Sequence, residues 1–147
     1  MKVKDILKIK GSKVYTINEN STLMAATAKL FSNKVGSLIV VNDQGEIVGI
    51  VAPNDILKAV HEGCVENCSL QKVNQVMTRN IICASEDDTL DYIQAVMTEN
   101  RIRDIPIMEQ KELKGLVSIG DVVNAQIKIR EVENHYLKDY IEGKYPG

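Results

Sequence analysis

The sequence predicts an α+β fold in which two β-α-β-β-α repeats pack with pseudo-two-fold symmetry and a C-terminal helical extension follows. Three observations support this prediction. The chain of 147 residues contains an internal duplication, with most aligned positions 66 or 67 residues apart. Within each half, short apolar stretches alternate with segments of helical periodicity. A unit of roughly 55 to 60 residues is marginal as a solitary fold, so the two units should pack together and share a core.

The duplication extends over most of the chain and sets the predicted organisation. It divides the sequence into a first repeat (1–62), a linker (63–70), a second repeat (71–128) and a helical extension (129–147). Repetition at a fixed offset is typical of two copies of one supersecondary unit. The aligned segments are Val3–Leu7 with Val73–Met77, Asn20–Leu23 with Asp87–Leu90, Asn33–Val35 with Asn100–Ile102, and Gly49–Leu57 with Gly115–Val123.

Each repeat is expected to begin with a short apolar strand, at Val14–Ile17 in the first repeat and at Ile81–Ala84 in the second. A helix follows, with Ser21 and Asp88 as the expected N-caps, because both side chains can accept a hydrogen bond from a free backbone N–H group. The apolar faces predicted from helical spacing are Leu23, Ala26, Leu30 and Phe31 in the first repeat, and Leu90, Ile93 and Met97 in the second.

Two further strands and a helix complete each repeat. Ser37–Val41 is a continuous apolar run typical of a buried strand, and a turn at Asn42–Gly45 should return the chain into Ile47–Val51. A second helix is expected to begin near Asp55. The counterparts in the second repeat are strands at Asp104–Met108 and Leu113–Val117, and a helix from near Asp121 to about Ile141.

The composition argues against several classes of function. The 18 basic and 20 acidic side chains give a net charge of −2, so there is no electrostatic reason to expect a nucleic-acid partner. No apolar run approaches the ~20 residues of a membrane span, so no membrane partner is expected. Three cysteines, an odd number, exclude a complete set of disulfides and favour a cytoplasmic protein with reduced thiols.

The sequence also lacks the usual signs of an enzyme. It contains two histidines, neither of them near Ser118 in sequence, and no Gly-rich Walker or Rossmann loop. Hydrolysis or group transfer needs a nucleophile with a base, paired carboxylates or a metal ion. We therefore expect a protein without catalytic residues, a bound cofactor or a metal site.

The most informative segment is Gly115–Asp121. A hydroxyl residue, Ser118, ends a strand there, and an acid, Asp121, follows three positions later at the start of a helix. The free N–H groups at a helix N-terminus suit an anion such as phosphate. The Asp121 carboxylate can accept hydrogen bonds from two vicinal hydroxyls, and the Ser118 hydroxyl can donate to a phosphate or sugar oxygen. The same pattern is also typical of an ordinary helix N-cap without a ligand.

These features together resemble a tandem cystathionine-β-synthase (CBS) domain pair, also called a Bateman module. Gly115–Asp121 matches the family's Gly-x-x-[Ser/Thr]-x-x-Asp motif, and Arg103–Ile107 resembles its basic-x-apolar-Pro-apolar strand. The resemblance covers about residues 3–130 and is strongest to small stand-alone two-CBS proteins. It implies a regulatory module that binds an adenosyl ligand between the repeats and signals by conformational change. AMP is the expected ligand, with ADP, ATP, NAD(H) and S-adenosylmethionine as alternatives.

The resemblance also implies roles for individual residues. Asp121 would bind the ribose, and Ser118 a ribose or phosphate oxygen. Arg103 would face the phosphate with its forked guanidinium group, and Arg101 is a second candidate for that role. The residues implied to border the adenine or to form an apolar wall are Ile82, Cys83, Ile105 and Pro106.

The first repeat departs from the family's pattern. Asp55 is kept, but Ala52 stands at the hydroxyl position, and Gly36–Val40 replaces the strand with the basic residue and the proline. We therefore expect one competent site, formed mainly by the second repeat. A weaker second site would be formed by Asp55, Thr16 and Ser37.

Two other functions stay open at this point. The chain could be a structural or adaptor dimer with vestigial sites, since Ala52 has already replaced one hydroxyl residue. It could instead be a metal or redox sensor, because His61, Cys64 and Cys68 are metal-ligating residue types, although their spacing fits no common zinc signature. Cys83, in a predicted strand, is expected to be a small core residue.

The predicted C-terminal helix carries an apolar stripe that needs a cover. Tyr136, Leu137 and Tyr140 form this stripe. They could pack on the chain's own core or on a second subunit, and we favour a homodimer. A regulatory module also implies a protein target, which the sequence does not identify.

Overall fold

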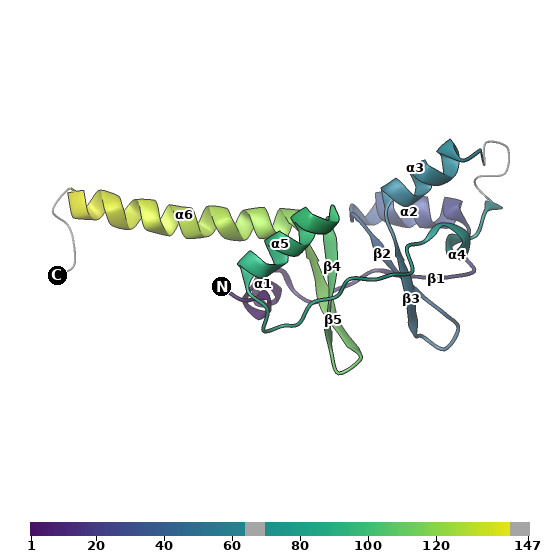
Figure 1. Cartoon of the computed structure of the whole chain (residues 1–147), viewed down its shortest axis with the longest axis horizontal. Coiled ribbons are helices and arrows are strands. Elements are labelled where there is room, and N and C mark those ends of the chain that lie inside the picture. Colours follow the sequence, from purple (N-terminus) through teal and green to yellow (C-terminus); the bar gives the residue numbers. More distant parts are fainter. Residues whose placement is uncertain (64–69, 142–147) are drawn as a thin grey trace.

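The computed structural model describes residues 1–63 and 70–141 and confirms the predicted α+β fold. The elements are α1 (Val3–Lys10), β1 (Thr16–Asn18), α2 (Leu23–Asn33), β2 (Leu38–Val41), β3 (Ile47–Val51), α3 (Pro53–His61), α4 (Val73–Val76), α5 (Leu90–Asn100), β4 (Asp104–Glu109), β5 (Glu112–Ser118) and α6 (Ile119–Ile141). They follow the expected order, except that an unpredicted helix precedes each repeat (α1 and α4) and the first strand expected in the second repeat is not formed. A long helix extends beyond the second repeat (Figure 1).

The first repeat contains a three-stranded sheet in the order β1-β2-β3. β1 lies parallel to β2, and β2 pairs antiparallel with β3, so that Ile39 faces Ile50. The predicted turn at Asn42–Gly45 is confirmed, because the Gly45 N–H donates to the Asn42 carbonyl (3.0 Å). Gly45 has a φ of 80°, a left-handed conformation that glycine adopts without steric cost.

The second repeat has two antiparallel strands, β4 and β5. The predicted strand at Ile81–Ala84 is wrong for most of its length, because only Ala84 forms a bridge, parallel to Ile107 in β4. Ile81 and Ile82 line a cavity between the repeats instead of pairing with an adjacent strand. In the first repeat the corresponding strand is formed, but it begins at Thr16 rather than at Val14.

The helices α2 and α5 are capped one residue later than predicted. The hydroxyls of Thr22 and Thr89 accept backbone N–H hydrogen bonds in the first turn, at 3.2 and 3.1 Å, so these residues replace Ser21 and Asp88 as N-caps. Phe31 is 85% exposed, so its predicted place on the core face is wrong. The other predicted core positions of the two helices are buried, as expected: Leu23, Ala26, Leu30, Leu90, Ile93 and Met97.

Each repeat takes its leading helix from the other half of the chain. α1 precedes the first repeat in sequence, but Val3, Ile6 and Leu7 lie in the core of the second repeat. α4 precedes the second repeat, but Val73 lies in the core of the first, together with Met77 just beyond the helix. Figure 1 shows α1 beside α5, β4 and β5, and α4 beside the strands of the first repeat. Neither core is complete without a helix from the other half.

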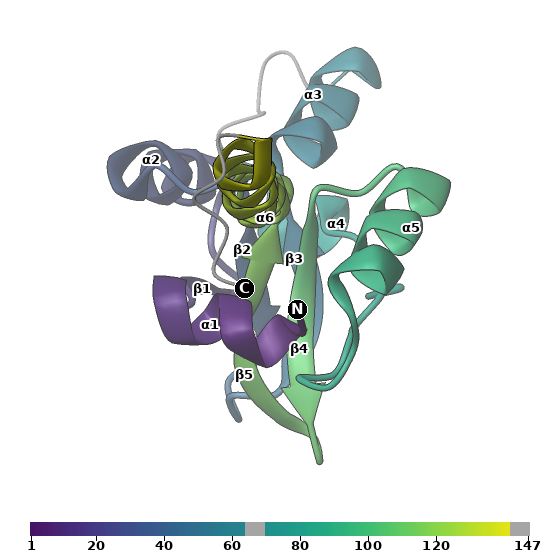
Figure 2. The same cartoon turned by 90° about the vertical axis from the view of Figure 1, so that its left-hand side faces the viewer.

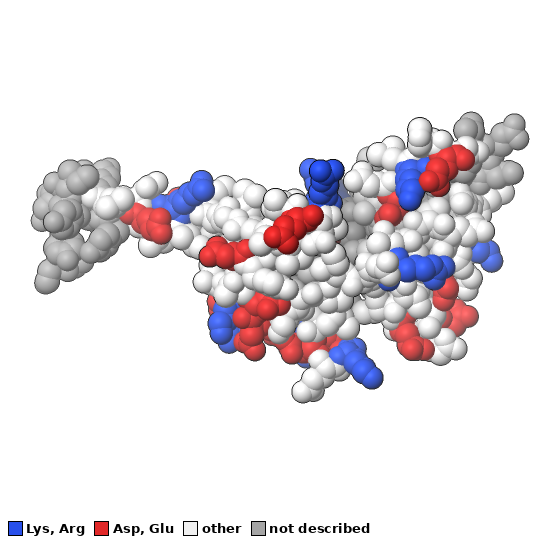
Figure 3. Space-filling model, viewed as in Figure 1, with Lys and Arg blue, Asp and Glu red and all other residues white. Residues whose placement is uncertain are grey.

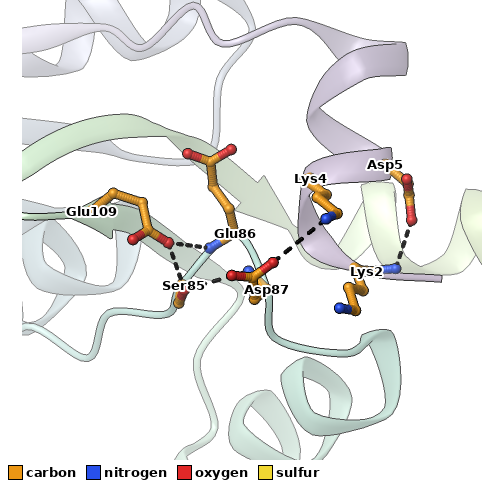
Figure 4. A network of polar contacts seen from close by, with 7 residues as sticks. All are labelled: Lys2, Lys4, Asp5, Ser85, Glu86, Asp87 and Glu109. Carbon is orange, nitrogen blue, oxygen red and sulfur yellow. Dashed lines mark hydrogen bonds and ion pairs between the residues drawn. The ribbon is translucent and has the colours of Figure 1, made fainter.

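Polar contacts hold the start of α1 against the second repeat (Figure 4). The Lys4 ammonium lies 3.5 Å from the Asp87 carboxylate. In the same network, the Glu109 carboxylate accepts hydrogen bonds from the Ser85 hydroxyl and from the Glu86 backbone N–H, and these bonds lower the pKa of Glu109. The network therefore links α1, the segment before α5 and the end of β4.

The long helix α6 confirms the predicted C-terminal extension (Figures 1 and 2). Val122 and Ala125, near its start, are buried in the core of the second repeat, whereas Val132 is 70% exposed. The side chains of Tyr136 and Tyr140, part of the predicted stripe, lie outside the described ones.

Among the residues that the structure describes, no helix combines the length and apolar character needed to cross a membrane. The cytoplasmic location expected from the sequence stays a prediction.

Candidate functional site

A cavity of about 460 Å³ lies between the two repeats. The first repeat lines it with the residues before β2, the end of β3 and the start of α3. The second repeat lines it with the segment after α4, the residues around the start of β4 and the end of β5. On the face shown in Figure 3, the surface is indented between the two halves, and basic side chains lie beside the indentation. The volume is within the usual range for small-molecule sites, about 300–1,000 Å³.

Asp55 is the carboxylate that the first repeat contributes to the cavity. It is the third residue of α3, which begins at Pro53. Its Oδ2 accepts from the Ala52 backbone N–H (2.8 Å), and its Oδ1 accepts from the Thr78 hydroxyl (3.0 Å). A carboxylate can accept about four hydrogen bonds, so Asp55 keeps acceptor capacity for a ligand.

Thr78 supplies the hydroxyl that the first repeat lacks at Ala52. It follows α4, and its backbone pairs with Ile50 of β3 through two hydrogen bonds of 2.8 and 3.0 Å. Sequence reasoning missed Thr78. The signal that could have found it is the similarity of Val3–Leu7 to Val73–Met77, because the residues after these two segments should occupy equivalent places.

Arg101 and Arg103 line the same cavity from the second repeat, together with Asp55 rather than with Asp121. Arg101 follows the last residue of α5 as its C-cap, in a left-handed conformation with a φ of 54°, and Arg103 immediately precedes β4. Both are exposed, and neither makes an ion pair with another described residue. Two guanidinium groups at one cavity favour an anionic ligand.

Apolar and hydroxyl groups complete the lining. Pro106 of β4 is buried and Ile82 is partly exposed, so both offer apolar surface to the cavity. Ser118 ends β5, and Ser37 is only 2% exposed just before β2. The structure thus brings the following predicted site residues to one cavity: Ser37, Asp55, Ile82, Arg101, Arg103, Pro106 and Ser118.

Asp104, which the sequence did not single out, also lines the cavity. Burial raises the pKa of its carboxyl above the ordinary value, although Lys10, Ser37 and Arg103 act to lower it. Gly36 of the first repeat lies so near that a side-chain carbon there would be 3.3 Å from Asp104 Oδ2. Asp104 therefore places a partly buried carboxyl at the contact between the repeats.

Asp121 does not line this cavity. It is the third residue of α6, and Ser118 lies at the N-cap position. The Ser118 N–H donates to Asp121 Oδ2 (2.8 Å), and the Asp121 N–H donates to Ser118 Oγ (3.2 Å). Asp121 Oδ2 also accepts from Lys10 Nζ at 2.6 Å. Burial acts to raise the pKa of Asp121, but the hydrogen bonds from Lys10 and Ser118 outweigh it, so that the pKa is lowered.

The other predicted site residues also lie outside the cavity. Ile105 is fully buried in the core of the second repeat. Thr16 lies in β1, where its carbonyl accepts from the Lys29 ammonium. Cys83 is exposed, so its predicted place in the core is wrong. The reason is that Cys83 belongs to the segment that does not form the predicted strand; partial burial still raises the pKa of its thiol.

The possible metal or redox group of His61, Cys64 and Cys68 lies partly outside the described residues. Cys64 and Cys68 are not among the described residues. Within residues 1–63 and 70–141, no three or more His, Cys, Asp and Glu side chains are grouped so that they could hold a metal ion.

The cavity is chemically suited to binding a ligand with polar groups at its two ends. Asp55 and Thr78 offer acceptor and hydroxyl groups on the side of the first repeat. Arg101 and Arg103 offer positive charge on the side of the second repeat, and the apolar side chains offer a surface for a flat ring.

Known proteins resemble this chain over nearly its whole length. The CBS domain family model matches residues 3–62 and 73–128, more than half of the chain. The CBS domain-containing protein CBSX3, mitochondrial, of Arabidopsis thaliana is 31% identical over 152 residues, covering 97% of this chain and 73% of that protein. The CBS-domain protein ATU1752 from Agrobacterium tumefaciens shares the fold with a TM-score of 0.83 at 34% identity, covering 86% of this chain and 99% of that one.

Two further relatives bear on function. The CBS domain pair of protein MJ0100, solved in complex with 5'-methylthioadenosine and S-adenosyl-L-methionine, has a TM-score of 0.72 at 28% identity, covering 85% of this chain and 94% of that one. A homoserine O-acetyltransferase of Methanococcus vannielii is 32% identical over 111 residues, 74% of this chain but only 22% of that enzyme. CBS-domain pairs are typically regulatory ligand-binding modules. Because both repeats match the family model and the fold is shared, the chain belongs to the CBS domain family as a tandem CBS-domain pair.

Proposed function

We propose that this chain is a regulatory module that binds an adenosine nucleotide in the cavity between its repeats, with AMP as the expected ligand. The observation that supports this proposal is the meeting, in one cavity, of the hydrogen-bonded pair Asp55–Thr78 with Arg101 and Arg103. The related CBS pair of MJ0100 was solved with two adenosyl compounds, which supports the same ligand class here. ADP, ATP, NAD(H) and S-adenosylmethionine are the alternatives within that class.

Each part of the cavity suits one part of a nucleoside monophosphate. Asp55 can accept hydrogen bonds from the two vicinal hydroxyls of a ribose. Ile82 and Pro106 can pack against the adenine ring, and Arg101 and Arg103 can pair with the phosphate. Asp55 thereby takes the role that the sequence motif assigns to Asp121.

A ligand in this cavity can regulate because both repeats contact it. A nucleotide that touches Asp55 in one repeat and Arg103 in the other binds most tightly to one relative arrangement of the repeats, and so favours that arrangement. A partner protein that contacts both repeats would then respond to the nucleotide concentration. With AMP as the ligand, the response would report the energy state of the cell.

We also propose that the module forms a homodimer. The first repeat exposes an apolar surface on α2 and α3, in which Phe31 is 85% exposed, and this surface contains a shallow groove. The equivalent helices of the second repeat, α5 and α6, also expose apolar side chains. Two similar faces on one chain suit a two-fold dimer that covers both of them in both copies. The exposed side chains are Met24, Phe31, Leu57 and Val60 in the first repeat, and Tyr92, Val123 and Ile127 in the second.

Calorimetric titration with AMP, ADP, ATP, NADH and S-adenosylmethionine tests the nucleotide proposal. Asp55→Ala should weaken binding of the preferred ligand at least about 10- to 100-fold, because losing even one hydrogen bond to a charged group costs about 1.5–3 kcal/mol. Asp91→Ala removes an exposed acid on α5 outside the cavity and should bind as the wild type does. Arg103→Gln should weaken AMP binding but leave adenosine binding unchanged, since adenosine has no phosphate.

Two results would contradict this assignment. Loss of binding in Asp121→Ala but not in Asp55→Ala would move the ribose site to the second repeat. Failure of all five compounds to bind the wild-type chain would remove the nucleotide function and favour a structural or adaptor role.

A further inference from the structure

We propose that the ion pair of Lys10 with Asp121 prevents a nucleotide from binding to the Asp121 carboxylate. The chain then binds one nucleotide, at Asp55. The inference rests on the proposed function, because it concerns which of two equivalent carboxylates a nucleotide can use. Lys10 is the last residue of α1, so this helix would determine how many nucleotides the chain binds.

The Lys10 ammonium makes two short contacts with the second repeat. Its Nζ lies 2.6 Å from Asp121 Oδ2, and it donates to the Leu116 carbonyl, also at 2.6 Å. The side chains of Lys10 and Asp121 are 30% and 20% exposed, so the ion pair is partly withdrawn from water. Such a pair is screened less than an exposed surface pair, and the second hydrogen bond fixes the position of the ammonium group.

Asp55 and Asp121 occupy equivalent positions 66 residues apart. Each is the third residue of a helix and accepts from the backbone N–H three residues earlier, at 2.8 Å in both cases. The two carboxylates differ in their remaining partner. Asp55 accepts from the neutral hydroxyl of Thr78, whereas Asp121 accepts from the charged ammonium of Lys10. Of these two acids, only Asp55 lines the cavity.

The exchange of leading helices is what places Lys10 there. Lys10 ends α1, whose Ile6 and Leu7 are buried in the core of the second repeat. Gly11 follows with a φ of 90°, and its N–H donates to the Leu7 carbonyl (2.8 Å), so the end of the helix is fixed. The chain after α4 reaches the first repeat and places Thr78 beside Asp55, although Thr78 aligns with Lys8 rather than with Lys10. One exchanged segment therefore delivers a cation, and the other a hydroxyl.

A ribose that binds both oxygens of Asp121 with its two vicinal hydroxyls must displace the ammonium group from Oδ2. Its hydroxyls carry no charge, so both Lys10 and Asp121 would lose a charged partner. Asp55 makes no ion pair with another described residue, so a ribose can bind there without breaking one. The first-repeat site, which looks weaker from its sequence motif, is thus the one open to a ligand.

The stoichiometry of AMP binding, measured by calorimetry, tests this inference. The wild-type chain should bind about one AMP, and Lys10→Ala should bind about two, because the Asp121 carboxylate is released. The additional event should disappear in the double variant Lys10→Ala/Asp121→Ala. Lys8→Ala removes another exposed lysine of α1 and is the matched control, which should still bind about one AMP. Lys10→Gln keeps a long donor side chain without the charge and should also bind about two.

Thermal unfolding of each variant establishes that it is folded. If Lys10→Ala does not fold, Lys10→Gln decides the outcome. A folded Lys10 variant that still binds one AMP would overturn the inference, and so would a wild-type chain that binds two AMP and loses one in Asp121→Ala. If the wild type binds none but Lys10→Ala binds AMP through Asp121, the proposed use of Asp55 fails while closure by Lys10 is supported. Absence of binding in every variant would overturn both.

Discussion

Asp104 lies between the repeats, and burial raises the pKa of its carboxyl. A folded-state pKa above the unfolded one means that ionised Asp104 opposes folding at any pH above the folded pKa. This penalty disappears as the pH falls through the folded pKa toward the unfolded one, because the group is then protonated in both states. Lys10 and Arg103 lower the pKa but do not cancel the effect of burial. The negative charge of Asp104 is therefore better tolerated when a cationic group lies near it or when the packing between the repeats leaves it more exposed to water.

Asp104→Asn should raise the melting temperature at neutral pH, because it removes a carboxylate that burial disfavours. The advantage over the wild type should shrink as the pH falls through the raised pKa of Asp104, and it should be gone below the ordinary aspartate pKa of about 4. Thermal unfolding across a pH series checks this. Asp91→Asn, at an exposed acid, should show little change at any pH. An Asp104→Asn chain that melts lower than the wild type at neutral pH would show that the charge is needed for folding.

At the scale of elements, α1 packs against β5, and the end of α4 with the residues after it packs against β3. Each of these contacts depends on a glycine in the strand. A Cβ built on Gly49 of β3 would lie 2.7 Å from Met77 Sδ and 2.9 Å from the Thr78 carbonyl oxygen. A Cβ on Gly115 of β5 would lie 2.7 Å from Leu7 Cδ2. The two glycines are equivalent positions, 66 residues apart in sequence. Close approach of another segment, rather than backbone conformation, explains why glycine stands at both.

Gly49→Ala should destabilise the protein by roughly 1–3 kcal/mol, the usual effect of overpacking. Gly115→Ala should cost less, because the end of the Leu7 side chain can rotate away, whereas the Thr78 carbonyl belongs to the backbone pairing with Ile50. Denaturant unfolding measures both changes. Gly120→Ala is the control: its new carbon meets only Ser118 Oγ, at 3.6 Å, and in helix α6 it should stabilise slightly. Equal losses at Gly49 and Gly115 would contradict this distinction.

At the scale of the whole molecule, the two halves are tied together by the exchange of α1 and α4, and this leaves other helix faces uncovered. The apolar surface that includes Phe31 lies on α2 and α3, whose positions Figure 1 shows. The equivalent helices of the second repeat, α5 and α6, also expose apolar side chains. Coverage of these faces by a second copy would remove them from water.

Phe31→Glu should convert the proposed homodimer into a monomer, because it would place a charge in the apolar contact between the copies. Light scattering of the purified chain measures the mass directly. Ile9→Glu, at an exposed apolar residue of α1 outside these faces, should leave the dimer intact. A wild-type chain that scatters as a monomer, or a Phe31→Glu chain that stays a dimer, would contradict the proposal.

Much of the fold could be predicted because it depends on local pattern. The duplication, the apolar runs of β2 and β3 and the turn that ends at Gly45 each lie within a short stretch of sequence. The errors have local causes too. Thr22 and Ser21 are adjacent residues with the same capping chemistry, so sequence alone does not choose between them. The predicted strand before Ala84 is apolar, but it meets a cavity rather than a neighbouring strand.

The sequence by itself determined the repeat architecture and the motif residues, since apolar periodicity and the spacing of Ser118 and Asp121 are properties of neighbouring positions. Only the tertiary structure decided which carboxylate faces the cavity. Asp55 meets a hydroxyl 23 residues away, and Asp121 meets Lys10, 111 residues away. Both contacts arise because each leading helix packs on the other repeat. Hydrophobic burial drives that exchange, and the polar partners of the two acids follow from it.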